Sequence, residues 1–154
     1  MSTSRIEIES RIPHRAPFLF VDRIVEETED HLVAEWKVPP EAWFFQGHYP
    51  SNPVTPGVIL SEHAFQCAAL MISALLGDER DAADTPVLTK IERARYKRIV
   101  RPAETVTTRV HVTERLGPAW YMAARVTCDG ATAVDIRFVL TSTGAMARLG
   151  EAAG

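Results

Sequence analysis

A run of twenty residues from Gly57 to Leu76, GVILSEHAFQCAALMISALL, is the most apolar stretch of this chain. Its length and near-continuous apolarity favour a helix over a strand. Pro56 suits the start of a helix, and Gly77 suits its C-terminal cap. After His63 the run is apolar nearly all round, so the helix has to be enclosed by the rest of the chain. The sequence therefore predicts one buried helix with other elements packed around it.

The same run is nearly long enough to span a bilayer, at about 28 Å as a helix. However, Glu62, His63 and Gln66 interrupt its first half, and a buried charge is costly in lipid. We therefore expect a core helix and no membrane span. The first ten residues are polar and charged, so no signal peptide is visible and we expect a cytoplasmic protein. Cys67 and Cys128 have no metal-ligand spacing, which favours free thiols.

The chain has 154 residues and a net charge of −3, which fits one domain with its own core. No repeat or linker is visible, so we expect a single domain over residues 1–154. Its core should cover about residues 11–143, and the tail at 144–154 should be frayed. The mild negative charge argues against a nucleic-acid partner.

Segments rich in β-branched and aromatic residues surround the helix in the sequence. Asp129-Gly130, between two of them, is typical of a tight hairpin. A helix followed by long antiparallel strands indicates an α+β fold in which the sheet wraps the helix. One helix cannot cover both faces of such a sheet, so we expect a dimer formed through the sheet or the helix face. Residues 18–21 should be buried, residues 42–45 should form a helical turn, and the predicted strands are 31–38, 87–100, 105–115, 120–128 and 131–142.

His48 lies in a proline-rich loop, within Gly47-His48-Tyr49-Pro50. Histidine is the natural general base near neutral pH. The plainer interpretation is a turn histidine bonded to a backbone carbonyl. Gly47 permits an unusual turn and Pro50 restricts the chain after it, and both features favour a functional histidine.

Glu62 lies in the second turn of the predicted helix, where a carboxylate is costly unless it is paired. Such surroundings favour the protonated acid, which is the form a general acid needs. The alternative is a solvated glutamate that stabilises the helix N-terminus. Unpaired backbone N–H groups from Gly57 onward could hold a carbonyl or an oxyanion. A base, an acid and an oxyanion donor together suit proton abstraction next to a carbonyl.

The other candidate groups give weaker signals. His14, His31 and His111 have no partner spacing and are interpreted as structural or surface residues. Gln66 lies one turn after Glu62 and is placed to orient it by a hydrogen bond. No metal motif or glycine-rich phosphate loop is present in the sequence. A basic cluster is either a solvated strand face or a docking surface for an acidic carrier or a phosphate group; it consists of Arg93, Arg95, Lys97, Arg98 and Arg101.

At these residues the sequence resembles the FabZ-type 3-hydroxyacyl-(acyl carrier protein) dehydratases of the FabA/FabZ family, which have the hotdog fold. The resemblance covers roughly residues 11–140. Its most specific part is the Gly-His-aromatic-Pro segment, followed at the right distance by Pro-Gly-Val and the helix glutamate. The matching segments are Pro13-His14-Arg15, Pro17-Phe18-Leu19, Val21-Asp22-Arg23, Phe44-Phe45, Gly47-His48-Tyr49-Pro50, Pro53-Val54, Pro56-Gly57-Val58, Glu62, Gln66, Ala94-Arg95-Tyr96-Lys97-Arg98, Pro102, Trp120 and Asp129-Gly130.

The resemblance implies a hotdog fold, with a long central helix wrapped by a curved antiparallel sheet, and a homodimer or a trimer of such dimers. It implies dehydration of a 3-hydroxyacyl thioester, carried by acyl carrier protein or coenzyme A, to the trans-2-enoyl thioester in fatty acid or related lipid biosynthesis. It further implies that no cofactor is needed. His48 of one subunit and Glu62 of the other would be catalytic. The implied substrate-binding residues are Gly57, Val58, Gln66, Phe45 and Phe65, and the implied docking residues are Arg95, Lys97 and Arg98.

The sequence also departs from this family. His63 and Phe65 stand where small residues are usual, and Thr55 stands where an apolar residue is common. These changes remove no catalytic group, but they leave the acyl length and the pathway open. Two other functions also remain open at this point. One is a hotdog thioesterase that activates water with a carboxylate, and the other is a non-catalytic acyl-thioester-binding protein.

Overall fold

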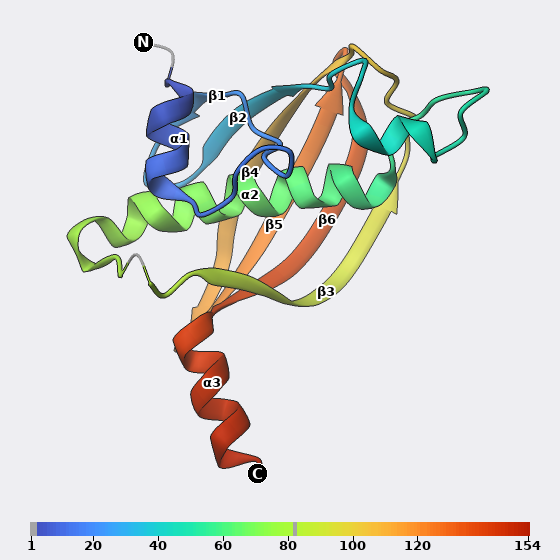
Figure 1. Cartoon of the computed structure of the whole chain (residues 1–154). Helices are drawn as coiled ribbons and strands as arrows, with labels where there is room; N and C mark the ends of the chain where they lie inside the picture. The colour runs from blue at the N-terminus through green and yellow to red at the C-terminus, as the bar shows by residue number, and fades with distance from the viewer. Residues whose placement is uncertain (1–2, 82) are drawn as a thin grey trace.

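A curved antiparallel sheet wraps around a long helix, α2 (Gly57–Leu76) (Figure 1). The computed structural model describes residues 3–81 and 83–154. Within them the sheet has six strands in the order β1-β2-β4-β5-β6-β3. The remaining elements are α1 (Arg5–Arg11), β1 (Arg23–Glu27), β2 (Leu32–Lys37), the 3-10 turns η1 (Trp43–Gln46) and η2 (Gly77–Glu79), β3 (Pro86–Tyr96), β4 (Thr105–Leu116), β5 (Ala119–Cys128), β6 (Ala131–Ser142) and α3 (Thr143–Ala152).

The predicted helix is confirmed at both ends. It begins after Pro56, where the missing N–H group of proline costs no hydrogen bond of the helix. It ends at Gly77, whose φ of +50° suits a residue without a side chain. The helix is long and apolar enough to span a membrane, but 72% of its most apolar 18-residue stretch is buried inside the fold. It is therefore the core helix of this α+β fold.

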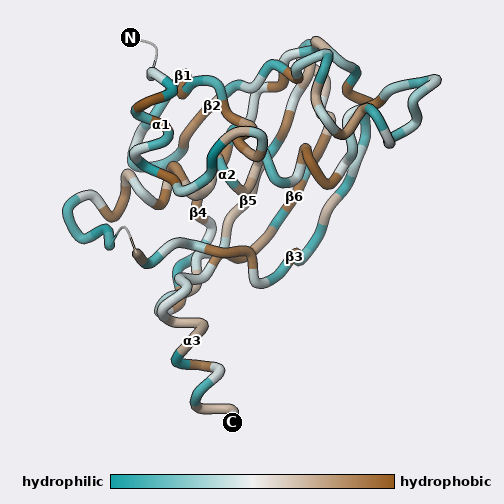
Figure 2. The backbone as a smooth tube through the Cα atoms, in the orientation of Figure 1, coloured by the Kyte–Doolittle hydropathy of each residue, from teal (hydrophilic) through white to brown (hydrophobic). Residues whose placement is uncertain are grey.

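The inner face of the sheet supplies the other half of the core. Along β5, side chains alternate between buried and less buried positions, as the two-residue period of a strand requires. Figure 2 shows apolar residues following α2 and recurring along the strands that face it. Burial of this apolar surface is the main force that holds helix and sheet together. The fully or almost fully buried residues of β5 are Trp120, Met122, Ala124, Val126 and Cys128.

The predicted Asp129-Gly130 hairpin is also confirmed. Asp129 and Gly130 have φ values of +50° and +75°, as the two central residues of a type I′ turn do. Cys128 and Ala131 pair directly across this turn, and the register of β5 against β6 shifts by one residue beyond Thr127, so that Val126 pairs with Val134. That register places the two strands' apolar side chains on the same inner face.

Three parts of the chain differ from the sequence-based expectation. Residues 5–11 form α1, with the Ser4 hydroxyl accepting a hydrogen bond from the Glu7 N–H group at 3.2 Å. Arg23–Glu27 form β1 and pair with β2, although no strand is predicted there from the sequence. The strand predicted over residues 87–100 ends at Tyr96, beyond which the chain bends toward Pro102.

The expectation of a frayed tail at residues 144–154 is wrong, because Thr143–Ala152 form α3. The Ser142 hydroxyl caps the helix by accepting from the Ala145 N–H group at 3.2 Å. A carboxylate oxygen of Asp84 accepts from the Gly144 N–H group at 2.8 Å, and this bond lowers the pKa of Asp84 below its usual value. These local caps satisfy the free N–H groups of the first turn, although α3 projects away from the sheet (Figure 1).

Candidate active site

The His48 side chain is held by the loop that precedes α2. Its Nδ1 atom lies 2.9 Å from the carbonyl oxygen of Val54. A carbonyl only accepts, so Nδ1 carries the proton and Nε2 keeps a free lone pair. Tyr49, the next residue, has a φ of +54°, so the loop turns sharply at this point. The plainer interpretation, a histidine bonded to a carbonyl, is correct for one ring nitrogen and leaves the other available as a base.

The N-terminus of α2 lies in the same region. Within the described part of the chain no side chain caps this helix end, so its first N–H groups remain available. The ring of Tyr96 packs against Gly57 so closely that an added Cβ would lie 3.0 Å from Tyr96 Cε1. The Tyr96 hydroxyl lies 2.7 Å from the Ser61 hydroxyl oxygen, which fixes the ring. Gly57 therefore lets the Tyr96 ring lie close to the N-terminus of α2, where a larger residue at position 57 would collide with the ring.

His48 and Gly57 line one cavity of about 450 Å³. It places a basic nitrogen and backbone N–H donors at a common space, as proton abstraction next to a carbonyl needs. Basic residues from the loop after β3 lie at the same cavity. The lining residues are His48, Val54, Thr55, Gly57, Leu60, Tyr96, Lys97, Arg98, Ile99 and Val100.

Glu62 is oriented by Gln66, as the spacing of these two residues predicts. The Gln66 Nε2 atom donates to Glu62 Oε1 at 3.1 Å. The orientation of the Gln66 amide is fixed, because its Oε1 atom accepts from the Phe20 N–H group at 2.8 Å. Its Nε2 atom also donates to the Phe18 carbonyl oxygen at 3.1 Å. Gln66 thus ties Glu62 to the N-terminal segment 12–22, which we call the strap.

Glu62 lies at a second cavity, of about 220 Å³, between the strap, α2 and the start of β3. Its side chain is 23% exposed, so it is less enclosed than the helix around it. Phe65 also lines this cavity, and its ring packs edge-on against Phe138 with centroids 4.7 Å apart. His14 reaches the cavity from the strap, with Nε2 3.4 Å from Glu62 Oε1. From the sequence His14 is expected to be a structural or surface residue, and the structure adds this contact with Glu62.

The two proposed catalytic residues do not meet within one chain, because His48 and Glu62 line different cavities. Three of the implied substrate-binding residues also line neither cavity: Phe45, Val58 and Gln66. Phe45 packs against Phe44 with ring centroids 4.7 Å apart, and Val58 is 73% exposed. We call the cavity at His48 the His48 half-site and the cavity at Glu62 the Glu62 half-site. Both lie along α2.

His63 follows Glu62 but points into the core, as its angular position on the helix predicts. It is fully buried, and its Nδ1 atom donates to the Phe20 carbonyl oxygen at 2.6 Å. Burial lowers the pKa of His63 to about 4, so the ring is neutral. Phe18, expected to be buried with the residues after it, is 43% exposed at the edge of this contact.

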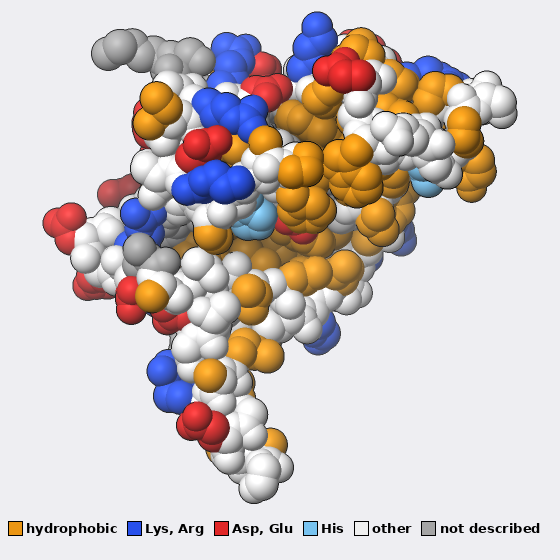
Figure 3. Space-filling view, in the orientation of Figure 1, with side chains coloured by type: hydrophobic (Ala, Val, Ile, Leu, Met, Phe, Trp, Pro, Cys, Tyr) orange, Lys and Arg blue, Asp and Glu red, His pale blue; other side chains and the backbone are white. Residues whose placement is uncertain are grey.

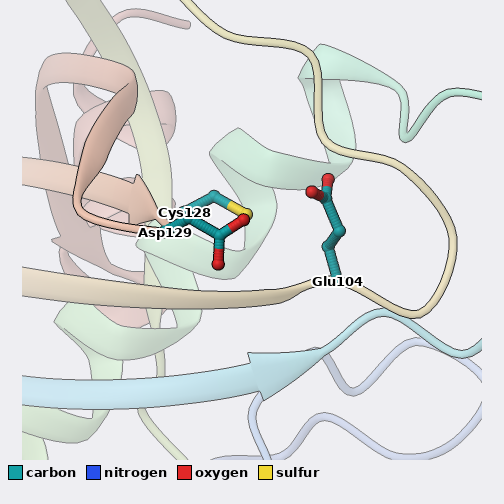
Figure 4. A group of neighbouring side chains, drawn as sticks. All are labelled: Glu104, Cys128 and Asp129. Atoms are coloured by element: carbon teal, nitrogen blue, oxygen red, sulfur yellow. The ribbon is translucent and has the colours of Figure 1, made fainter.

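The basic cluster is not uniformly available for docking. Arg95 and Lys97 are exposed, whereas Arg98 pairs with Glu104 at 3.1 Å and with Asp129 at 3.2 Å. The Glu104 carboxylate raises the pKa of Arg98 above its usual value. Figure 4 shows Glu104 and Asp129 beside Cys128, with ligand-type atoms of the three within 4.8 Å of one another. Because the Arg98 guanidinium binds both carboxylates, we interpret this group as an ion-pair cluster.

Residues 12–137 match the FabA-like domain family. The chain belongs to this family. A FabA-like relative from Staphylococcus carnosus, named 3-hydroxyacyl-(acyl-carrier-protein) dehydratase FabZ, is 39% identical over 128 residues, covering 82% of this chain and 86% of its own. A relative of the same name from Anaeromyxobacter dehalogenans is 36% identical over 135 residues, covering 87% of this chain and 86% of its own.

Solved structures confirm the hotdog fold of this FabA-like chain. The dehydratase heterocomplex ApeI:P from Xenorhabdus doucetiae superposes with a TM-score of 0.71 at 14% identity, covering 87% of this chain and 89% of the other. A hypothetical thioesterase from Streptococcus pneumoniae, solved with coenzyme A, gives a TM-score of 0.60 at 16% identity, covering 78% and 84%. At these identities the structures show the fold alone.

Proposed function

We propose that this FabA-like protein dehydrates a 3-hydroxyacyl thioester to the trans-2-enoyl thioester, as a hydro-lyase of fatty acid or related lipid biosynthesis. The observation that carries the proposal is the fixed tautomer of His48, a residue that lines the same cavity as the uncapped N-terminus of α2. The relatives named as dehydratases of carrier-bound substrates support the same reaction.

In the reaction, the thioester carbonyl accepts hydrogen bonds from the N–H groups at Gly57, which stabilise the enolate that forms. The Nε2 atom of His48 takes a proton from C2. The bond between C3 and its hydroxyl then breaks, and Glu62 donates a proton so that the hydroxyl leaves as water. The electron pair of the C2–H bond becomes the new double bond. The thioester itself acidifies C2, so the proposal needs no cofactor.

A second copy of the chain completes each site in this proposal. β3 is an edge strand, and its backbone and most of its side chains are exposed. An exposed edge of eleven residues is a template for pairing with another strand. The other edge, β1, has five residues, and most of them are charged. Pairing through β3 would cover Val87, Leu88 and Ile91, and it would bring the His48 half-site of one chain to the Glu62 half-site of the other.

Figure 3 supports this arrangement. Apolar side chains gather between the strap and β3 on the face that it views, with a histidine and an acidic side chain among them. An exposed apolar patch of this kind marks an interface or a binding groove. Further assembly into a trimer of dimers is compatible with the closed symmetry usual for homo-oligomers.

For the carrier, we propose docking at the mouth of the His48 cavity. Lys97 lies at that cavity, and Arg95 is exposed on the same strand end. Both are available to an acidic carrier, whereas Arg98 is already neutralised by two carboxylates. Arg95→Glu should therefore slow turnover of a carrier-bound substrate more than turnover of a short thioester analogue. An equal effect on both substrates would count against docking here.

The test of the activity compares His48→Ala and Glu62→Gln with the wild type, using 3-hydroxyacyl and saturated acyl thioesters in separate assays. We expect enoyl product only from the first substrate, and a kcat lower by about 10²- to 10⁴-fold in each variant. Release of free thiol from the saturated thioester, without enoyl product from the other, would instead show a thioesterase. Full turnover by His48→Ala would show that the base is wrongly assigned.

A further inference from the structure

His14 approaches Glu62 from the strap. The two side chains are 25% and 23% exposed, and the His14 Nε2 atom lies 3.4 Å from Glu62 Oε1. His14 and Glu62 are the two ionisable residues among the described residues that line their cavity, whose other walls are formed mostly by apolar side chains. In such surroundings a single polar neighbour has a strong effect on how a carboxyl group carries its proton.

Both polar neighbours of Glu62 face the same oxygen. Gln66 donates to Oε1 at 3.1 Å, and its amide cannot be reversed because the Phe20 N–H group fixes it. His14 lies against this same Oε1 atom. The two atoms are within ion-pair distance but not in hydrogen-bond geometry in this structure, and catalytic contacts of this kind often tighten only when substrate binds. The Oε2 atom has neither of these neighbours.

The tautomer of His14 follows from its other ring nitrogen. Nδ1 is buried and has no hydrogen-bond partner among residues 3–81 and 83–154. A buried N–H group without a partner is rarer and more costly than a buried acceptor without one. The ring proton therefore belongs on Nε2, the nitrogen that lies 3.4 Å from the Glu62 carboxyl group.

The position of His14 is set by the strap and not by α2. The Arg15 guanidinium donates to the carbonyl oxygens of Ile12 and His14, at 2.9 and 2.7 Å. The Phe18 N–H group donates to the Arg15 carbonyl oxygen at 2.8 Å, which closes the turn. These bonds hold the backbone on both sides of His14, so the imidazole is presented to Glu62 from a fixed frame.

We propose that His14 is a positioning residue that, together with Gln66, occupies Oε1 of Glu62 and so places the acid's proton on Oε2. When Glu62 is protonated, an oxygen that accepts two hydrogen bonds is a poor site for the proton. Oε2–H is then the group that faces the departing hydroxyl of the substrate. After the transfer, the two donors on Oε1 stabilise the carboxylate that remains. The inference rests on the proposed role of Glu62 as the acid.

The test uses His14→Gln and His14→Asn as a matched pair. A glutamine places its amide nitrogen about where Nε2 lies, whereas an asparagine reaches only about as far as Nδ1. We expect His14→Asn to lower kcat for dehydration about 10-fold with little change in KM, as loss of one donor to an ionised group does. His14→Gln should stay within about 3-fold of the wild type for the same reason.

The pH profile separates positioning from a structural role. Loss of the donor in His14→Asn should move the limb of the kcat/KM profile governed by Glu62 to higher pH, because a carboxylate without that donor holds its proton more tightly. The limb governed by His48 should stay in place, and His14→Gln should restore the wild-type profile. A structural role would lower the stability of both variants and leave both limbs unmoved.

Three outcomes would overturn the inference. They are an unchanged kcat and profile in His14→Asn, an equal loss in folded His14→Gln and His14→Asn, and failure of both variants to fold. Glu62→Gln separates this failure from that of the proposed function. If Glu62→Gln is inactive while His14→Asn behaves as the wild type, only the role of His14 is wrong. If Glu62→Gln retains full activity, the acid itself is wrongly assigned.

Discussion

Glu62 and His63 are adjacent in the sequence, yet the helix turns them into opposite environments. Glu62 faces a cavity beside His14, whereas His63 is fully buried and donates to the Phe20 carbonyl oxygen at 2.6 Å. Successive residues of a helix are about 100° apart, so one step separates the cavity from the core. Both residues contact the strap, and burial keeps His63 there in its neutral form.

His63 makes stability depend on pH with a predictable sign. Its pKa is lowered from 6.5 to about 4 by burial, so the unfolded chain binds a proton at a higher pH than the folded protein does. The free energy of unfolding should therefore be at its full value above about pH 7 and fall between about pH 6.5 and 4, by at most about 3 kcal/mol.

Urea unfolding at several pH values measures this dependence. His63→Asn keeps a donor near the position of Nδ1 and removes the titration, so the decline at low pH should be shallower in that variant. His111→Asn makes the same change at an exposed position and should leave the slope as in the wild type. An equally steep decline in His63→Asn and the wild type would show that other groups cause it.

At the scale of elements, the strap and α2 are joined through one side chain. The Gln66 amide binds the Phe20 N–H group, the Phe18 carbonyl oxygen and Glu62. The strap crosses the first half of α2 and buries Leu19, Phe20 and Val21 against it. The Gln66 amide therefore both attaches the strap to α2 and orients the Glu62 side chain.

Gln66→Leu should destabilise the fold by about 2 to 4 kcal/mol, because it leaves the buried Phe20 N–H group and the part-buried Phe18 carbonyl oxygen without partners. Chemical denaturation monitored by circular dichroism measures the change. Gln46→Leu makes the same substitution at an exposed position of η1 and should stay within about 0.5 kcal/mol of the wild type. If both variants lose the same stability, the amide does not join strap and helix.

α3 stands apart from this framework. Among its described residues only Ala145 is buried, and the helix extends away from the sheet (Figure 1). A chain ending at Met146 keeps the Ser142 cap and the contact of Asp84 with Gly144, so it should lose less than about 1 kcal/mol of stability. Dehydration activity should be unchanged. A loss of activity in a folded truncated protein would place α3 in the assembly or the site.

At the scale of the whole molecule, the separate cavities of His48 and Glu62 have a functional consequence. If one chain supplies the base and its partner supplies the acid, two different inactive variants can complete one another. In a mixed dimer of His48→Ala and Glu62→Gln, one of the two sites contains both wild-type residues. Equal mixing with exchange of subunits should thus restore about a quarter of the wild-type activity.

The measurement is the rate of enoyl thioester formation before and after the two variants are unfolded and refolded together. Mixing His48→Ala with a chain carrying both substitutions serves as the control, because no dimer in that mixture contains a complete site. Recovery only in the first mixture supports shared sites. No recovery, with mixed dimers demonstrated by mass spectrometry, would place His48 and Glu62 of each site within one chain.

The sequence by itself determined the central helix, its ends, the hairpin at Asp129-Gly130 and the pairing of Glu62 with Gln66. These features depend on contacts between near neighbours, which spacing and local residue preferences describe. The tertiary structure alone decided the rest. His14 and Glu62 are far apart in the chain. They meet because Arg15 donates within the strap and fixes its turn, and because the Gln66 amide of α2 accepts from the Phe20 N–H group and holds the strap on the helix.

The tertiary structure likewise decided that Arg98 is neutralised by Glu104 and Asp129, and that His48 and Glu62 line different cavities. Both the ion pairs of Arg98 and the separation of the two cavities depend on how the strands pair and how the strap and loops pack on the helix. The free energy of such contacts depends on the environment that the folded chain creates, and no local pattern in the sequence encodes that environment. The sequence therefore predicted a base and an acid, and the fold decided which side chains lie against them.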